Sequence, residues 1–71
     1  MEKKAFLEKL GKRIKYYREL KGITINQMSE RTGIRKEYLR KIEDGNAPGA
    51  MTSQIVRIAL VLDVRMQQLV E

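Results

Sequence analysis

The segment spanning residues 22–45 constrains the fold more than any other part of the chain, because it carries start and stop signals for two short helices. Thr24 is a natural N-cap for the first helix, and Gly33 stands where glycine can take a positive φ and end it. A second helix is expected over residues 35–44, with a glycine directly after it. Two short helices joined by a turn form a helix-turn-helix, which we expect over residues 24–44.

Apolar residues recur at three- and four-residue steps outside this segment, which predicts further helices. The first 20 residues predict one long helix ending near Gly22, with a buried face made of Phe6, Leu7, Leu10, Ile14 and Tyr17. The first helix of the helix-turn-helix is expected over residues 25–32. Two more follow over residues 52–62 and 66–70. Strand-like alternation is absent from the sequence, so we expect an all-α fold, with residues 1–71 forming a single domain.

The composition argues against several classes of function. The 71 residues include no cysteine and no histidine, so neither a disulfide framework nor a thiolate metal site is available, and the commonest general base is missing. We therefore expect a protein that is not an enzyme and holds no metal or cofactor. The longest apolar run, residues 58–62, is far too short to span a membrane, and the N-terminus lacks the apolar core of a signal peptide. These features predict a cytoplasmic chain without a membrane segment.

The positive charge is unevenly placed along the sequence. The formal net charge is +6, of which residues 1–23 carry +5, residues 24–45 carry +1, and residues 46–71 are neutral. A basic region beside a neutral one favours a face that binds a polyanion. Scattered lysines on a solvated helix surface would give a similar count, so charge alone leaves both interpretations open.

The helix expected over residues 35–44 has one charged face and one apolar face. On a helical wheel Leu39 and Ile42 point inward, while the outward set comprises Lys36, Glu37, Arg40, Lys41 and Asp44. Lysine and arginine suit the acceptor edge of guanine, and a glutamate can accept a hydrogen bond from the cytosine amino group. The alternative is an ordinary amphipathic helix in which Glu37 and Lys41 form a surface pair.

The joint spacing of these features resembles a known family, the Xre-type helix-turn-helix domain of phage repressors and Cro. The resemblance covers about residues 10–70. The residues that carry it are Arg13, Ile14, Lys15, Arg18, Gly22, Ile23, Thr24, Met28, Ser29, Gly33, Ile34, Leu39, Ile42, Glu43, Gly45, Ala59 and Leu62. It implies a compact five-helix repressor-like domain from a bacterium or phage. Such a domain binds double-stranded DNA with its third helix in the major groove, as a small transcriptional regulator, with repression favoured.

The resemblance also implies roles for individual residues. Arg18 and Glu43 would form a structural pair that orients the reading helix. The positions that read bases in the family fall on Lys36, Glu37, Arg40 and Lys41. The positions that contact phosphates fall on Thr24, Ile25, Asn26 and Asn46, with Arg35 as an added phosphate ligand.

This chain departs from the family pattern at both helix starts of the helix-turn-helix. Ile25 stands where the family has a glutamine, so one polar contact to phosphate is missing. Arg35 replaces the usual serine or threonine that starts the reading helix, and arginine is a poor N-cap. These departures bear on the strength of DNA binding more than on the fold.

The helix over residues 52–62 is apolar on nearly every side. Leu60 occupies a position that is usually polar in the family, and with Met66 and Val70 it is a candidate interface for a homodimer. Such a dimer would place two reading helices on adjacent half-sites of DNA. The alternative is that these residues are extra core or singly exposed.

A second functional interpretation uses the same fold without DNA. Residues 34–39 also resemble the helix-turn-helix of RodZ-like cytoskeletal adaptors, which binds protein, and an antitoxin-type partner binder is a related possibility. A membrane-surface helix built from the N-terminal lysines is disfavoured, because its apolar stripe is better explained as core. No small-molecule ligand is expected.

Overall fold

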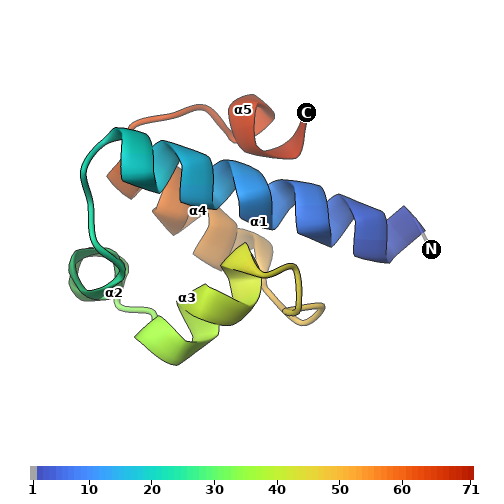
Figure 1. Cartoon of the computed structure of the whole chain (residues 1–71), viewed down its shortest axis with the longest axis horizontal. Coiled ribbons are helices and arrows are strands. Elements are labelled where there is room, and N and C mark those ends of the chain that lie inside the picture. Colours follow the sequence, from blue (N-terminus) through green and yellow to red (C-terminus); the bar gives the residue numbers. More distant parts are fainter. Residues whose placement is uncertain (1) are drawn as a thin grey trace.

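The computed structural model describes residues 2–71, which form five helices in chain order (Figure 1). These are α1 (Glu2–Leu20), α2 (Ile25–Thr32), α3 (Lys36–Glu43), α4 (Thr52–Leu62) and α5 (Met66–Val70). In Figure 1, α1 crosses the molecule, with α2 and α3 on one side of it, α5 on the other and α4 behind. The expected all-α fold with five helices is confirmed, and the described residues contain no strand.

Every helix contributes apolar side chains to one shared core. The residues whose side chains are fully buried are Ile14, Met28, Leu39, Ile58, Leu62 and Leu69. Phe6 is an exception to the predicted apolar face of α1, since it is 45% exposed, and the expectation that it is buried is wrong. Phe6 lines an open groove with Ile55 of α4 and Val70 of α5, and these helices cover its ring only in part.

Three of the helices begin with the same hydrogen bond. In α2, α4 and α5 the side-chain oxygen of a glutamine at the third helical position accepts the backbone N–H of the residue that precedes the helix, at 2.8–2.9 Å. The three glutamines are Gln27, Gln54 and Gln68. At α2 the bond is reciprocal, because Thr24 Oγ1 accepts the backbone N–H of Gln27 at 3.1 Å. This complete capping box satisfies two N–H groups that the helix itself leaves unpaired.

The start of α3 has no such support. Arg35 precedes the helix and makes no side-chain capping hydrogen bond. The helix therefore spans Lys36–Glu43, one residue shorter at each end than residues 35–44 predicted from sequence. Since α3 lacks a side-chain cap of its own, its position depends on the elements packed against it.

Close approach to α1 is one of these constraints. A Cβ atom placed on Gly11 of α1 would lie within 3.0 Å of the carbonyl oxygens of Ile42 and Glu43, in the last turn of α3. Only glycine lets the two backbones come this near. The C-terminal end of α3 is thus pressed directly onto the middle of α1. No helix within residues 2–71 has both the length and the apolar character needed to cross a membrane.

Candidate nucleic-acid interface

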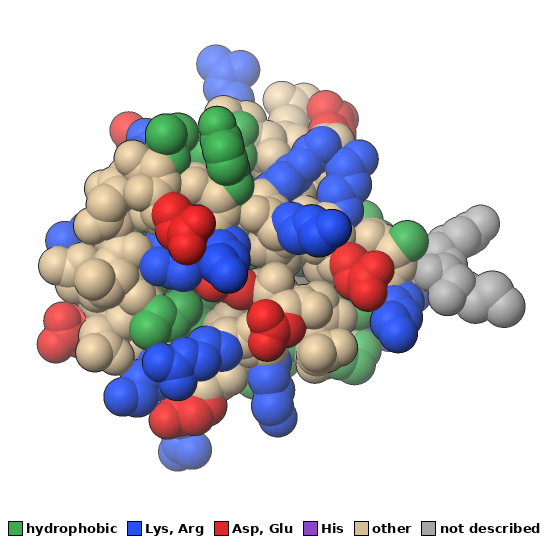
Figure 2. Space-filling view, viewed as in Figure 1, with side chains coloured by type: hydrophobic (Ala, Val, Ile, Leu, Met, Phe, Trp, Pro, Cys, Tyr) green, Lys and Arg blue, Asp and Glu red, His purple; other side chains and the backbone are tan. Residues whose placement is uncertain are grey.

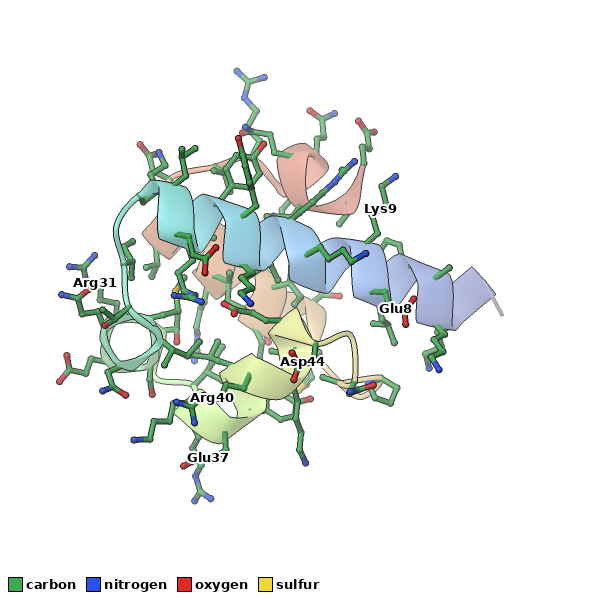
Figure 3. All side chains as sticks on the ribbon, in the orientation of Figure 1. Glu8, Lys9, Arg31, Glu37, Arg40 and Asp44 are labelled. Carbon is green, nitrogen blue, oxygen red and sulfur yellow. The ribbon has the colours of Figure 1, made fainter. Side chains whose placement is uncertain are left out.

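The charged face of α3 is exposed to solvent, and its apolar face is buried in the core. Leu39 is 0% exposed and Ile42 is 3% exposed. The exposed residues of this helix and its C-cap are Lys36, Glu37, Arg40, Lys41 and Asp44, as the helical wheel predicted. In Figure 3 the labelled side chain of Glu37 projects from α3 away from the rest of the molecule. Three cations and two carboxylates therefore share one accessible helix surface.

An ion pair with α1 fixes the C-terminal end of α3. Arg18 Nε donates to Glu43 Oε2 at 2.6 Å, and a second guanidinium nitrogen donates to Glu43 Oε1 at 3.1 Å. The side chains are only 12% and 6% exposed. The remaining terminal nitrogen of Arg18 donates to the Ile23 carbonyl at 2.9 Å, so the same guanidinium also holds the connection between α1 and α2. A bidentate, largely buried pair of this kind gives strong geometric specificity.

Arg18 remains charged over the whole pH range in which a protein is normally studied. Hydrogen bonding to Glu43 raises the pKa of Arg18 above its ordinary value, and burial opposes this effect without cancelling it. A raised pKa stabilises the fold at all pH values below the unfolded pKa, and that stability is lost only as the pH rises through the folded pKa. Arginine is already protonated far above neutral pH, so its side of the pair does not titrate under ordinary conditions.

The start of α2 offers backbone donors to an anion. The capping box occupies the N–H groups of Thr24 and Gln27, whereas those of Ile25 and Asn26 lie in the first turn, where the helix provides no acceptor. The first turn contains no acidic residue. The side chain of Ile25 is half-buried against the core, so only its backbone is available at this surface. The positive end of the α2 dipole is therefore open to a negatively charged group.

A groove of about 400 Å³ lies where the end of α1, the start of α2 and the end of α3 meet. Its walls come from α1, from the start of α2 and from the C-terminal half of α3. The lining residues are Lys15, Arg18, Thr24, Ile25, Arg40, Glu43 and Asp44. The structure thus brings two of the predicted phosphate-contacting positions together with one predicted base-reading position. Lys15 belongs to the same groove but was not among the predicted site residues, although its place one turn before Arg18 on α1 was a signal for it.

The other predicted phosphate-contacting residues lie elsewhere around α3. Arg35 is exposed at the start of the helix and lines a separate groove with Tyr38 of α3 and Arg57 of α4. Asn46 is exposed in the loop after α3, where its N–H donates to the Lys41 carbonyl at 2.8 Å. The predicted set therefore surrounds α3 in three places and does not form one cluster.

The three residues predicted for a dimer interface do not line one common pocket. Leu60 is 74% exposed on α4. Met66 and Val70 are half-buried against the core and line an apolar groove of about 160 Å³ with residues of α1 that include Phe6 and Leu10. Leu60 is not part of that groove. The exposed apolar surface of this end of the molecule is therefore divided between α4 and the α1–α5 junction.

A turn that joins two short helices, the second anchored by its apolar face and charged on its outer face, defines a helix-turn-helix protein. A family model described as a helix-turn-helix domain matches residues 11–70, and the chain belongs to that family. The resemblance drawn from the sequence is confirmed.

Individual relatives agree with this assignment. The chain is 32% identical over 62 residues to the HTH-type transcriptional regulator SinR of Bacillus subtilis, a match that covers 87% of this chain and 56% of the relative. It is 33% identical over 60 residues to SlrR of the same organism, covering 84% of this chain and 40% of the relative. The chain thus spans about half the length, or less, of these curated relatives.

A solved structure matches the fold over nearly its whole length. The restriction-modification controller protein C.AhdI from Aeromonas hydrophila superposes with a TM-score of 0.85 at 26% sequence identity. The match covers 92% of this chain and 97% of the other. The helices within the matched 92% of the chain thus follow an arrangement already observed in a controller protein.

Proposed function

We propose that this chain binds double-stranded DNA in a sequence-specific manner, as a small regulator of transcription that acts as a repressor. The observation that carries the proposal is the exposed, mostly cationic face of α3, whose opposite face is fully buried. A helix held in this way can enter the major groove without losing its orientation. The relatives support the proposal, since SinR and SlrR are named transcriptional regulators and C.AhdI a controller protein.

In this proposal the outer residues of α3 read base edges. Lys36, Arg40 and Lys41 donate to the guanine acceptors, and Glu37 accepts from a cytosine amino group. Glu37 also limits non-specific binding, because a carboxylate facing a phosphate is unfavourable.

The phosphate backbone is contacted around α3. The open N–H groups of Ile25 and Asn26 hold one phosphate at the start of α2, beside the hydroxyl of Thr24. Lys15 adds a cation to the same groove. Arg35 and Asn46 contact phosphates on the two remaining sides of the helix. These contacts carry no sequence information, but they set the register of α3 in the groove.

We propose further that the five helices act as one domain in the cytoplasm, without catalytic activity, and that two copies associate. Leu60, which is 74% exposed, provides an apolar side chain for that contact, with Met66 and Val70 nearby in sequence. A Leu60→Glu variant is expected to keep its helical circular dichroism while the dimer weakens in analytical ultracentrifugation. A parent chain that remains monomeric at high concentration would remove this part of the proposal.

The test of DNA binding is selection from random duplexes followed by a salt titration of the winning sequence. We expect a palindromic winner, with log affinity falling against log salt at a slope of about −0.9 for each phosphate neutralised. Lys41→Ala is expected to relax the preference at one base position and to cost about 1–3 kcal/mol.

Lys9→Ala is the matched control for that substitution. Lys9 is exposed on α1 and lies on the opposite side of α1 from α3 (Figure 3). The Lys9→Ala substitution removes the same charge as Lys41→Ala, and we expect it to leave the preference for DNA sequence unchanged. If Lys41→Ala and Lys9→Ala bind the selected duplex equally well, α3 does not read bases. A chain that selects no sequence would point instead to the protein-binding alternative.

A further inference from the structure

A second groove lies on the other side of α1, where the long helix passes α5. Its volume is about 670 Å³. The lining residues are Arg13, Tyr16, Tyr17, Arg65, Gln67, Gln68 and Glu71. In Figure 2, basic side chains and an exposed hydrophobic group lie together over this part of α1. The proposed DNA interface uses none of these residues.

The walls of this groove are fixed by their own contacts. The Tyr16 and Tyr17 rings pack edge to face with their centroids 5.1 Å apart and their planes at 78°. Gln68 accepts the Arg65 N–H through its side-chain oxygen at 2.8 Å and reaches the Tyr17 hydroxyl with its amide nitrogen at 3.5 Å. Tyr16 nevertheless remains 59% exposed. A large aromatic ring is thus held in place but left open to solvent.

Two arginines and one glutamate line the groove, which leaves an excess of one positive charge. Within residues 3–71 neither Arg13 nor Arg65 has a carboxylate within 4.0 Å. One terminal nitrogen of Arg13 approaches the Gln68 carbonyl at 3.4 Å, a distance too long for a strong hydrogen bond. Most of the guanidinium donors in the groove are therefore available to an incoming acceptor. Glu71 is the single acidic residue of the lining.

We propose that this groove binds an acidic segment of a partner protein. Carboxylates of the segment pair with the guanidinium groups of Arg13 and Arg65, because arginine binds carboxylates in a bidentate, planar geometry. An apolar or aromatic side chain of the segment covers the exposed face of Tyr16. The Gln67 and Gln68 side chains and backbone supply polar contacts along the floor.

A protein segment fits this surface better than a second DNA duplex does. A duplex is bound by a row of cations that follows its backbone, whereas here two cations flank an aromatic wall and a carboxylate lies among them. α5 and α3 lie on opposite sides of α1 (Figure 1), so one duplex seated on α3 does not reach the groove. The partner segment can therefore bind while α3 is occupied, and the proposal does not depend on DNA binding.

The test uses the full chain labelled with ¹⁵N and an acetylated, amidated hexapeptide of five glutamates and one central phenylalanine. Backbone and arginine side-chain resonances are followed during titration. We expect the largest shifts at Arg13, Tyr16 and Arg65, with little change on α3. The hexapeptide in which glutamine replaces every glutamate is expected to bind at least 10-fold more weakly.

Two double variants with equal loss of charge provide the control. Arg13→Gln with Arg65→Gln is expected to weaken the peptide at least fivefold, while Lys36→Gln with Arg40→Gln leaves its affinity unchanged. If the double variant folds poorly, Arg65→Gln alone provides the test, because Arg65 is exposed. This single variant is expected to show part of the loss of peptide affinity.

Four results would overturn the proposal. These are the absence of peptide binding, shifts centred on α3, shifts in the groove caused equally by duplex DNA, and shifts in the groove that depend only on the concentration of the chain itself. The last would identify a second copy as the occupant.

Discussion

α2 and α3 are both eight residues long, but they are held in place by different means. α2 has a complete capping box at its start and a left-handed glycine, Gly33, at its end. α3 has no side-chain cap at its start, and its left-handed glycine, Gly45, comes one residue later, after the right-handed Asp44. Besides its buried apolar face, α3 is fixed by contacts with α1, through the bidentate pair of Arg18 and Glu43 and the backbone approach at Gly11.

The difference shows how a helix can be rigid and still present an open surface. At α2 the capping box uses the N–H groups of Thr24 and Gln27 and leaves those of Ile25 and Asn26 open. The stabilising contacts of α3 lie instead on its buried face and at its C-terminal end. Its outer face remains free for another molecule. The following substitutions test this division, in order of decreasing effect.

Removing the arginine of the buried pair should have the largest effect. Arg18→Leu leaves the Glu43 carboxylate buried without a partner, and we expect the free energy of unfolding to fall by about 3–5 kcal/mol. Urea denaturation followed by circular dichroism measures the loss. Arg18→Lys keeps the charge but not the bidentate geometry, so its loss should be smaller. A loss below about 1 kcal/mol for Arg18→Leu would mean that the pair does not anchor α3.

Adding a methyl group at the contact between α1 and α3 should lower the free energy of unfolding by nearly as much. Helix propensity alone predicts that Gly11→Ala stabilises α1 by up to about 1 kcal/mol. The new methyl group would meet two carbonyl oxygens of α3, however, so we expect a net loss of about 3 kcal/mol. Gly49→Ala is the control, because nothing lies within 4 Å of a Cβ there, and it should change stability by less than about 0.5 kcal/mol. Equal stability of the two variants would refute the close approach.

The cap of α2 should contribute less than either constraint on α3. Thr24→Ala removes the acceptor for the Gln27 N–H, and we expect a loss of about 1 kcal/mol in the same denaturation assay. Thr24→Ser keeps the hydroxyl and should retain most of the stability. If serine and alanine are equally destabilising, the methyl group of Thr24 matters and the hydrogen bond does not.

Giving α3 the cap that it lacks should produce the smallest change and the opposite sign. Arg35 has φ −58° and ψ 140°, an extended geometry that suits an N-cap serine. We expect Arg35→Ser to stabilise the fold by about 0.5 kcal/mol and to weaken DNA binding through the loss of a phosphate contact. Arg35→Gln, which loses the charge without adding a good cap, should show the weaker binding alone.

Much of this arrangement could be predicted from the sequence. The bounds of α2 follow from start and stop signals, whereas those of α4 and α5 were predicted from apolar spacing, and the structure agrees with all three. The ends of α3 were predicted one residue too far on each side, because its local signals are weak. The burial of Phe6 was predicted wrongly, since periodicity shows which face of a helix is apolar but not how completely the neighbouring helices cover each residue on it.

The candidate site was only partly accessible to sequence reasoning. The outward set on α3 follows from helical geometry alone, whereas the pairing of Arg18 with Glu43 came from the family resemblance. Lys15 was missed because its groove exists only where α1, α2 and α3 meet. The acidic-segment groove likewise depends on α5 lying beside α1, which no local pattern encodes.

The contact of Gly11 with the last turn of α3 also sets the smallest piece of the chain that can present this helix. Isolated helices shorter than about 12–15 residues are marginal in water. α3 is oriented by Gly11 and Arg18 of α1, and Arg18 lies 25 residues before its partner Glu43. A synthetic peptide of residues 22–45 should therefore be largely unstructured. A graft of α3 onto another scaffold would have to bring along the glycine and the arginine of α1 that hold it.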